Sequence, residues 1–249
     1  MPTEKCRQRA YWNGLAELPP DTSVIDPRDT RGHKNAYIAS IRDEAILSTF
    51  RKTVDANGVV LDFGCGTGSA SLCLLRQGYH VLGLDIALSL LRHARQRCDA
   101  KKSLFAAVGG DTLPVARESL DAAVTYVVLS YVVEDADVMR LLRAIHTSLK
   151  PGARLVAIEQ CRKSRTVIEG GLKIHRPIEE WCELLRSAGF KSVESGIVRS
   201  GRFPMIPLIR QGWIPRLFWP VIRRAERLLG RTLLTLSGDY VEVTFEGIA

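Results

Sequence analysis

The chain has 249 residues, of which 46% are apolar and 25% are charged, a composition typical of a soluble globular protein with one core. No apolar run approaches the roughly 20 residues that a membrane-spanning helix needs, and the N-terminus lacks the apolar core of a signal peptide. The formal net charge is +8, and most of it lies between Arg199 and Arg231, where eight arginines face the single acid Glu226. We therefore expect a cytoplasmic protein with a basic region near its C-terminus.

The first 55 residues are predicted to be helical and irregular. Residues 4–18 suit one helix that Pro19 and Pro20 stop, and a polar loop is expected over residues 21–34. Apolar residues then recur at helical spacing in residues 35–54, which predicts a second helix.

From residue 59 onward, short apolar runs alternate with helical patterns. The predicted strands are 59–63, 80–85, 103–108, 121–128 and 153–159, and the predicted helices are 69–78, 87–98 and 135–152. The tripeptide Lys150-Pro151-Gly152 is expected to stop the last of these helices. Runs rich in valine and leucine suit strands that are buried on both faces. This alternation predicts a doubly wound α/β fold with a mostly parallel sheet.

The pattern changes after residue 160. A helix is predicted over residues 176–189 and a strand over 190–201, followed by an apolar, arginine-rich stretch over 203–236. Residues 239–247 alternate cleanly between polar and apolar side chains, which predicts a half-buried or edge strand.

A glycine-rich turn, LDFGCGTG, follows the first predicted strand. It contains Asp62 and the glycines 64, 66 and 68. Such turns lie where open α/β sheets bind ligands, because glycine permits close approach of the backbone. The dinucleotide fingerprint is G-x-G-x-x-G, whereas this spacing is G-x-G-x-G with an acid before it. A carboxylate there suits a cationic ligand better than a pyrophosphate, which it would repel.

At these residues the sequence resembles the class I S-adenosylmethionine-dependent methyltransferases, especially the small-molecule branch that includes the ubiquinone and menaquinone methyltransferases. Four elements stand in the family's order over residues 55–160: LDFGCGTG, GLDIA, GGDTLPVARESLDAAV and LKPGARLVAIE. The resemblance implies a seven-stranded sheet with a helical N-terminal segment and a helical insertion before an antiparallel last strand. It also implies one domain over 1–249, with a helical cover (1–55), a cofactor-binding core (56–160) and an acceptor-side half (161–249).

The resemblance assigns roles in binding S-adenosylmethionine, whose product is S-adenosylhomocysteine. Asp62 and the turn of Gly64, Cys65, Gly66 and Gly68 would face its methionine part, and Asp85 would accept hydrogen bonds from both ribose hydroxyls. The remaining expected contacts are Asp111 and Thr112 at the adenine amino group, Ile86 and Leu113 on the adenine faces, and Tyr126 and Val127 near the methionine.

No sequence motif identifies the residues that act on the acceptor as clearly as the glycine turn identifies the cofactor site. Methyl transfer to a hydroxyl requires a base that removes its proton. The candidates are His33 in a polar loop, Glu159 at the end of the fifth strand, and His175 in a loop after two glycines. Tyr37 and Tyr131 are expected either to line the acceptor pocket or to lie in the core.

Some acceptor classes are disfavoured after the fourth strand. Enzymes that methylate the amino groups of nucleobases or glutamine typically carry an Asn/Asp-Pro-Pro-Tyr/Phe run there, but this chain reads YVVLSYVVED. Many small-molecule relatives have a histidine pair near this place, where this chain has Ser130-Tyr131. The specificity of any relative is therefore not carried over.

The stretch 203–236 interleaves large apolar residues with arginines. It suits either a cap over an anionic or lipid-linked acceptor, with Arg210 and Trp213 as contacts, or a peripheral helix on an anionic membrane surface. A helical cap that merely packs on its own sheet is the plain alternative. Binding of nucleic acid by this stretch is a weaker prediction, because no RNA-binding motif accompanies the basic residues.

The combined hypothesis is a cytoplasmic methyltransferase, with a peripheral membrane contact left open, acting on a hydroxyl of a sugar, a lipid-linked glycan or another small molecule. Three rivals remain: a C-methyltransferase of a quinone or other lipid, a non-catalytic S-adenosylmethionine-binding protein and, less favoured, an NAD-dependent dehydrogenase. No metal site is predicted, because the six cysteines form no C-x-x-C pair and no histidine cluster accompanies them.

Overall fold

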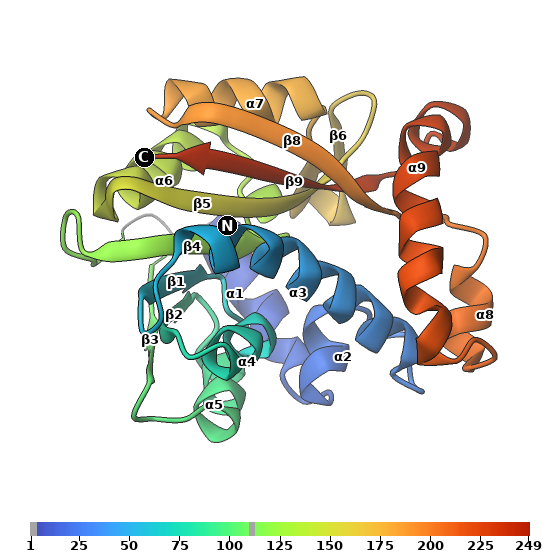
Figure 1. The fold of residues 1–249 in the computed structure, drawn as a ribbon, viewed down its shortest axis with the longest axis horizontal. Coiled ribbons are helices and arrows are strands. Elements are labelled where there is room, and N and C mark those ends of the chain that lie inside the picture. The colour runs from blue at the N-terminus through green and yellow to red at the C-terminus, as the bar shows by residue number, and fades with distance from the viewer. Residues whose placement is uncertain (1–3, 110–112) are drawn as a thin grey trace.

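A seven-stranded sheet with helices on both faces forms the centre of the computed structural model, which describes residues 4–109 and 113–249 (Figure 1). The strand order is β3-β2-β1-β4-β5-β9-β8. The bounds are β1 Val59–Phe63, β2 His80–Asp85, β3 Ser103–Ala107, β4 Leu120–Tyr126, β5 Leu149–Cys161, β8 Lys191–Ser200 and β9 Val241–Ile248. Among these strands β9 runs antiparallel to both neighbours, and the other pairings are parallel. The doubly wound, mostly parallel fold predicted from the sequence is confirmed.

Each face of the sheet packs on its own helices. On one face, Val60 joins a core with α3 (His33–Thr53) and α4 (Ser69–Arg76), and α5 (Leu88–Arg97) lies beside them. On the other, Leu61 joins a core with α6 (Asp135–Ser148) and α7 (Ile178–Ser187). Neighbouring residues of a strand point to opposite faces, so one apolar run supplies both cores. Burial on both faces explains the lack of polar alternation in the parallel strands.

The end of α6 differs from the prediction. The helix stops at Ser148, and Lys150-Pro151-Gly152 lies within the first part of β5. The Lys150 ammonium donates to Asp121, and the Gly152 N–H donates to the carbonyl of Ala249. Hydrogen bonds to neighbouring strands therefore draw this tripeptide into the sheet.

The last strand was expected to be half-buried or at an edge, and this was wrong. β9 lies between β5 and β8, and its first five residues are buried. Its polar side is covered because Glu242 pairs with the buried Arg199 of β8 at 3.0 Å. Alternation here separates an apolar core from a buried polar cluster, and not from water.

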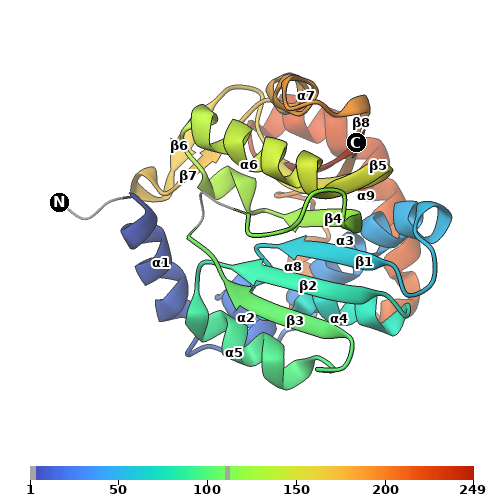
Figure 2. The same ribbon diagram turned by 90° about the vertical axis from the view of Figure 1, so that its left-hand side faces the viewer.

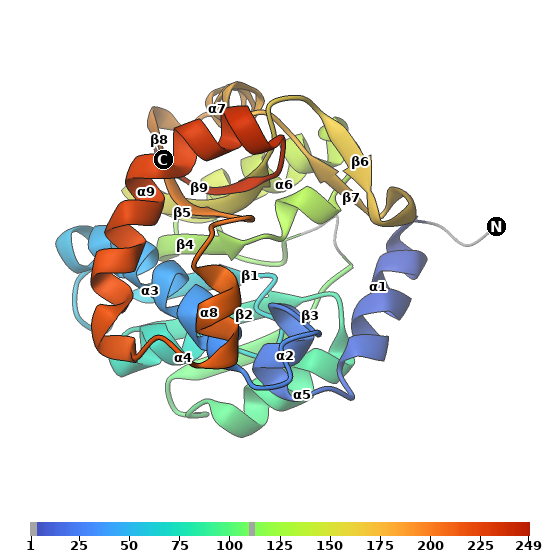
Figure 3. The same ribbon diagram turned by 90° about the vertical axis from the view of Figure 1, so that its right-hand side faces the viewer.

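The N-terminal segment forms α1 (Glu4–Leu15) and α2 (Pro20–Val24), so Pro20, expected to stop the first helix, begins a short second helix that runs into the expected loop. Figures 2 and 3 show α1 beside a hairpin of β6 (Thr166–Ile168) and β7 (Lys173–His175), joined by the short helix η2 (Glu169–Gly171). The amide of Gln8 fastens α1 to the carbonyls of Tyr131 and Leu172, at 2.9 and 2.5 Å. Residues far apart in the chain thus meet at one end of the sheet.

The arginine-rich stretch forms α8 (Ile206–Gln211), the short helix η3 (Arg216–Phe218) and α9 (Trp219–Ser237). Figure 3 shows α9 running along one side of the molecule. Gly230 lies where α9 crosses β8, and a Cβ there would come within 2.5 Å of Ile197. Glycine weakens a helix interior, but here it permits close packing on the sheet. Among the described residues, no helix has the length and apolarity that a bilayer crossing requires.

Candidate functional site

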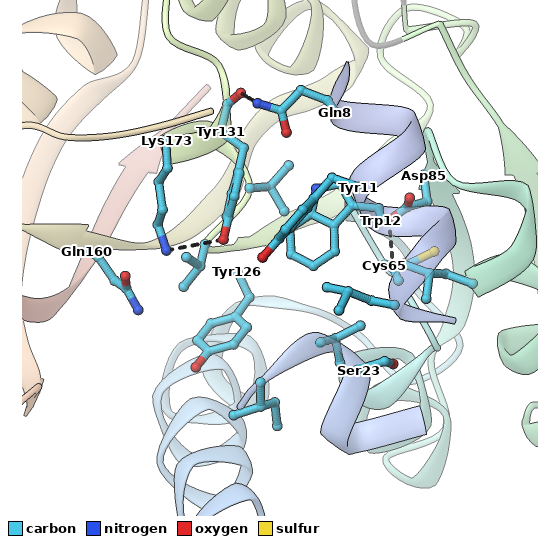
Figure 4. A pocket seen from close by; sticks show the side chains of 18 of the residues that line it. Gln8, Tyr11, Trp12, Ser23, Cys65, Asp85, Tyr126, Tyr131, Gln160 and Lys173 are labelled. Carbon is cyan, nitrogen blue, oxygen red and sulfur yellow. Dashed lines mark hydrogen bonds between the residues drawn. The ribbon is translucent and has the colours of Figure 1, made fainter. Parts of the chain in front are cut away.

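A cavity of about 880 Å³ lies at the carboxyl ends of β1, β2 and β4. Residues of α1, α2, α3, α8, the β6–β7 hairpin and the ends of β5, β8 and β9 also line it. Figure 4 shows several of these side chains. The cavity is lined by eleven of the residues that the sequence singled out: Asp62, Gly64, Cys65, Gly66, Asp85, Ile86, Tyr126, Val127, Tyr131, His175 and Arg210.

The glycine turn bends tightly between β1 and α4. The backbone N–H groups of Gly64 and Cys65 both donate to the carbonyl of Leu84, at 2.7 and 3.1 Å. Gly64 has a φ of +75°, and a Cβ there would lie 2.1 Å from a methyl of Val128. The turn therefore needs glycine for its conformation and for the packing of the neighbouring loop. Gly68 lies outside the cavity and caps α4 with a φ of +77°.

Asp85 ends β2 and is nearly buried. Its two carboxylate oxygens accept backbone N–H groups from Gly66 and Ala87, each at 2.8 Å. Burial raises the pKa of this carboxyl, and those backbone donors oppose the rise. A carboxylate oxygen accepts more than one hydrogen bond, so both oxygens retain capacity for ligand hydroxyls.

Asp62 is the last residue but one of β1 and lines the same cavity. It accepts a 2.6 Å hydrogen bond from the Ser71 hydroxyl. Burial raises its pKa to about 6, against the effects of Ser71 and of the Arg42 guanidinium. Two buried carboxylates beside the turn favour a cationic ligand group and would repel a phosphate. Burial also raises the pKa of the Cys65 thiol, which remains neutral.

Only some of the other predicted cofactor contacts line the cavity. Ile86 and Val127 line the cavity, and Val127 has a φ of +54° while its N–H donates to the carbonyl of Ile158. Leu113 is partly buried and packs against the core that contains residues of α6 and α7, and it is not among the residues that line the cavity. Asp111 and Thr112 lie outside the described residues, so their roles remain predictions.

His175 lies at the opposite end of the cavity. It was expected in a mobile loop, but it ends the strand β7 and is 1% exposed. Its Nε2 lies 3.2 Å from the amide oxygen of Gln160, and its Nδ1 has no hydrogen-bond partner among the described residues. Burial lowers its pKa to about 4, and the charges of Lys173 and Arg162 act in the same direction. The imidazole is therefore neutral at pH 7, and its environment disfavours the protonated form.

Glu159 is fully buried and is not among the residues that line the cavity. Its oxygens accept four hydrogen bonds, from the N–H groups of Val128, Leu129 and Ser130 and from the Ser130 hydroxyl. These residues include the start of the short helix η1 (Leu129–Tyr131). The carboxylate thus holds the loop after β4 in place.

Three further candidates lie away from the cavity lining. His33 begins α3 as an exposed residue, with its ring against Gly212. The Tyr37 hydroxyl donates to Glu226 at 2.8 Å inside the core of α3, α8 and α9. Trp213 is 72% exposed. Helix packing, which the sequence pattern does not specify, decides these positions.

Sequence reasoning missed several residues that line the end of the cavity near His175. Lys173, Gln160, Tyr11 and Trp12 surround Tyr131 there (Figure 4). Lys173 precedes His175 by two residues in a strand, and such residues share a face. Because a loop was predicted at these residues, the spacing could not mark Lys173 from the sequence alone. No signal marks the residues of α1 either, because only the tertiary fold brings that helix over the cavity.

Arg210 lines the cavity from α8, where its guanidinium pairs with Asp26 at 3.0 Å.

The part of the chain that the structure describes contains no group of three or more His, Cys, Asp or Glu side chains able to hold a metal ion.

Comparisons with known proteins agree with this geometry. A family model described as a methyltransferase domain matches residues 60–152. A demethylmenaquinone methyltransferase of Tropheryma whipplei (strain Twist) is 33% identical over 114 residues, which cover 46% of this chain and 46% of that protein. The chain thus spans less than half the length of this curated relative.

Solved structures share the fold at low sequence identity. A S-adenosylmethionine-dependent methyltransferase of Leishmania major has a TM-score of 0.68 at 14% identity, covering 99% of this chain and 83% of its own. The phosphoethanolamine N-methyltransferase 2 of Haemonchus contortus, solved with S-adenosyl-L-methionine, has a TM-score of 0.63 at 15% identity, covering 91% and 58%.

Proposed function

Because this chain belongs to the class I S-adenosylmethionine-dependent methyltransferases, we propose that it transfers a methyl group from S-adenosylmethionine to a small acceptor beside His175. One observation carries the proposal: a single cavity joins the two buried carboxylates at the glycine turn to a buried, neutral histidine. The two carboxylates suit a cationic cofactor, and the histidine suits the role of a base.

The residues at the turn fit this cofactor. Asp85 offers both oxygens to the ribose hydroxyls, and Asp62 and the close-approaching backbone at Gly64 suit the amino acid part. The two carboxylates also oppose the pyrophosphate of NAD, which makes a dehydrogenase the weaker alternative. When bound, the cofactor supplies an electrophilic methyl group on a sulfonium.

His175 is the base in this proposal. Its Nδ1 has no hydrogen-bond partner among the described residues and is itself buried, so in this proposal the ring turns toward the cavity and Nδ1 takes the proton of the acceptor hydroxyl as that oxygen attacks the methyl group. His33 and Glu159 have no part in it, because neither lines the cavity. The acceptor that we propose is a hydroxyl of a sugar, a lipid-linked glycan or another small molecule.

A second candidate is C-methylation of a quinone or another lipid. The 33% identity to a demethylmenaquinone methyltransferase favours it, and aromatic side chains line the acceptor end of the cavity. Removal of a hydroxyl proton by His175 would serve this reaction too, because an ionised ring hydroxyl makes the ring carbon a nucleophile.

A peripheral contact with an anionic membrane is part of the proposal. Six large apolar side chains of the segment after α8 are exposed: Trp213, Leu217, Phe218, Val221, Leu228 and Leu229. Arg224 and Arg231 are exposed among them, whereas Glu226 is fully buried. Glu44 of α3 pairs with Arg223 and Arg227 beside this face, but the segment itself is apolar and basic and its one acid is buried, which suits an anionic lipid surface.

Calorimetry tests the cofactor and a labelled-methyl assay tests the transfer. We expect S-adenosylhomocysteine to bind and NADH not to bind; heat with NADH alone would refute the cofactor assignment. Lysate fractions incubated with the protein and methyl-labelled S-adenosylmethionine should yield a labelled small molecule. His175→Asn should retain binding of S-adenosylhomocysteine and lose labelling. Binding without labelling by the wild type in every fraction would favour the non-catalytic alternative.

A further inference from the structure

Lys173 is a buried ammonium group at the acceptor end of the cavity. Its side chain is 7% exposed, and Figure 4 shows it extending from β7 toward the hydroxyl of Tyr131. A buried lysine is costly unless an anion or several acceptors compensate its charge. The neighbours of Lys173 therefore indicate what the cavity is built to receive.

The partners of Lys173 compensate its charge only in part. The Tyr131 hydroxyl lies 3.4 Å from Nζ, and the nearest carboxylate, Glu169, is 4.0 Å away with a side chain 35% exposed to water. Burial lowers the pKa of Lys173 although Glu169, Glu159 and Glu242 attract the charged form. Burial thus outweighs those three carboxylates.

Two of those carboxylates are engaged elsewhere. Glu159 accepts its four hydrogen bonds from the loop after β4. Glu242 pairs with Arg199 at 3.0 Å and accepts from Gln160 at 3.1 Å. An ammonium group has three N–H donors, so Lys173 retains donors for a ligand in the cavity.

Aromatic rings surround this ammonium. Nζ lies 4.7 Å from the centre of the Tyr131 ring, which meets the Trp12 ring edge-on at 4.9 Å and stacks on Tyr11 at 6.5 Å. The Gln8 hydrogen bonds to the carbonyls of Tyr131 and Leu172 hold α1 so that these rings stay together. Flat apolar walls beside a donor of positive charge suit a planar molecule with an acidic oxygen.

We propose that Lys173 binds the ionised oxygen of a planar phenolic acceptor, whose ring lies against Tyr131 and Trp12. This deepens the proposed function, on which its relevance to methyl transfer rests, by naming the acceptor as a phenol. On binding, the acceptor releases its hydroxyl proton to solvent water, the electron pair remains on oxygen, and the Lys173 ammonium compensates the resulting negative charge.

The probe for this site is 4-nitrophenol, whose phenolate absorbs visible light and whose neutral form does not. We expect the wild-type protein to bind the phenolate selectively, so that the bound probe ionises at a lower pH than the free probe. Lys173→Met should lose this shift and bind the phenolate about 10- to 100-fold more weakly, as expected for loss of a charge-assisted hydrogen bond. Lys173→Arg should keep part of the shift.

Lys150→Met is the matched control, because Lys150 is exposed and pairs with Asp121 away from the cavity. It should behave as the wild type. Melting temperature and calorimetry with S-adenosylhomocysteine establish that each variant is folded. An unchanged shift in Lys173→Met, or no binding of the probe by the wild type, would overturn the proposal. The absorbance readout needs neither cofactor nor turnover, so a protein that fails to bind S-adenosylhomocysteine but shifts the probe refutes the proposed function alone.

Discussion

The carboxylate of Asp85 accepts a 2.8 Å hydrogen bond from the backbone N–H of Gly66. This bond joins the end of β2 to the glycine turn after β1, so one side chain both shapes the turn and faces the cavity. Removal of Asp85 should therefore affect the cofactor site in two ways.

Asp85→Ala should weaken binding of S-adenosylhomocysteine about 100-fold or more, as measured by calorimetry. It removes the acceptors proposed for two ribose hydroxyls, each worth about 1.5–3 kcal/mol as a bond to a charged group, and leaves the N–H of Gly66 unpaired. Asp85→Asn keeps one acceptor oxygen and should be intermediate. Asp55→Ala is the control, because Asp55 is exposed and lies before β1. Equal affinity in the Asp85 variants and the wild type contradicts the ribose role.

Gly64→Ala should destabilise the protein more than Gly78→Ala. Both glycines have positive φ, so each alanine meets backbone strain of about 1–2 kcal/mol. The added Cβ at position 64 would also lie 2.1 Å from Val128, whereas position 78 has no atom within 4 Å. Thermal unfolding measures both variants, and Gly64→Ala should in addition lose cofactor affinity. Equal melting temperatures of the two variants would show that the turn at Gly64 accommodates a side chain, which contradicts the prediction.

His175 should make the protein less stable in acid. The pKa of His175 is lowered to about 4 in the folded protein from an ordinary value near 6.5. Between these values the unfolded chain binds the proton more readily, so the free energy of unfolding falls as the pH drops from about 6.5 to about 4. The full effect is on the order of 3 kcal/mol. Chemical denaturation of the wild type and of His175→Asn at several pH values measures it, and the variant should have the flatter profile. Parallel profiles would mean that another group controls acid stability.

Binding to vesicles should depend on the exposed face of the segment from η3 to α9. We expect co-sedimentation with anionic vesicles at low salt and little with zwitterionic vesicles. Arg224→Glu with Arg231→Glu should reduce binding about tenfold or more, at about 1 kcal/mol for each basic side chain. Leu217→Asp should reduce it too, because that side chain is 82% exposed.

Leu104→Asp is the control for the vesicle experiment. Leu104 is 65% exposed, but it lies on β3, at the sheet edge opposite β8. Its variant should bind vesicles as the wild type does. If the wild type does not sediment with anionic vesicles at low salt, the membrane contact is refuted.

The local sequence predicted the parallel core well. β1 and β2 have the predicted bounds because their valine and leucine runs are buried on both faces, and the glycine turn follows from the position of its glycines. Such features depend on neighbours in the chain. The edge assignment of β9 failed because alternation reports a polar side, while Arg199 of another strand makes that side part of the interior.

By itself, then, the sequence determined the order of the parallel strands and their connecting helices, the glycine turn with Asp62 before it, and the place of Asp85 at the end of β2, because each depends on backbone conformation or residue spacing within a short segment. Only the tertiary structure decided which distant residues share the cavity. It brought Tyr11 and Trp12 of α1 to Tyr131 and Lys173, and it left Tyr37 and Trp213 away from that lining. The physical reason is that helix packing and hairpin placement depend on contacts between segments more than 100 residues apart, such as Gln8 with Tyr131 and Leu172, which no local pattern encodes.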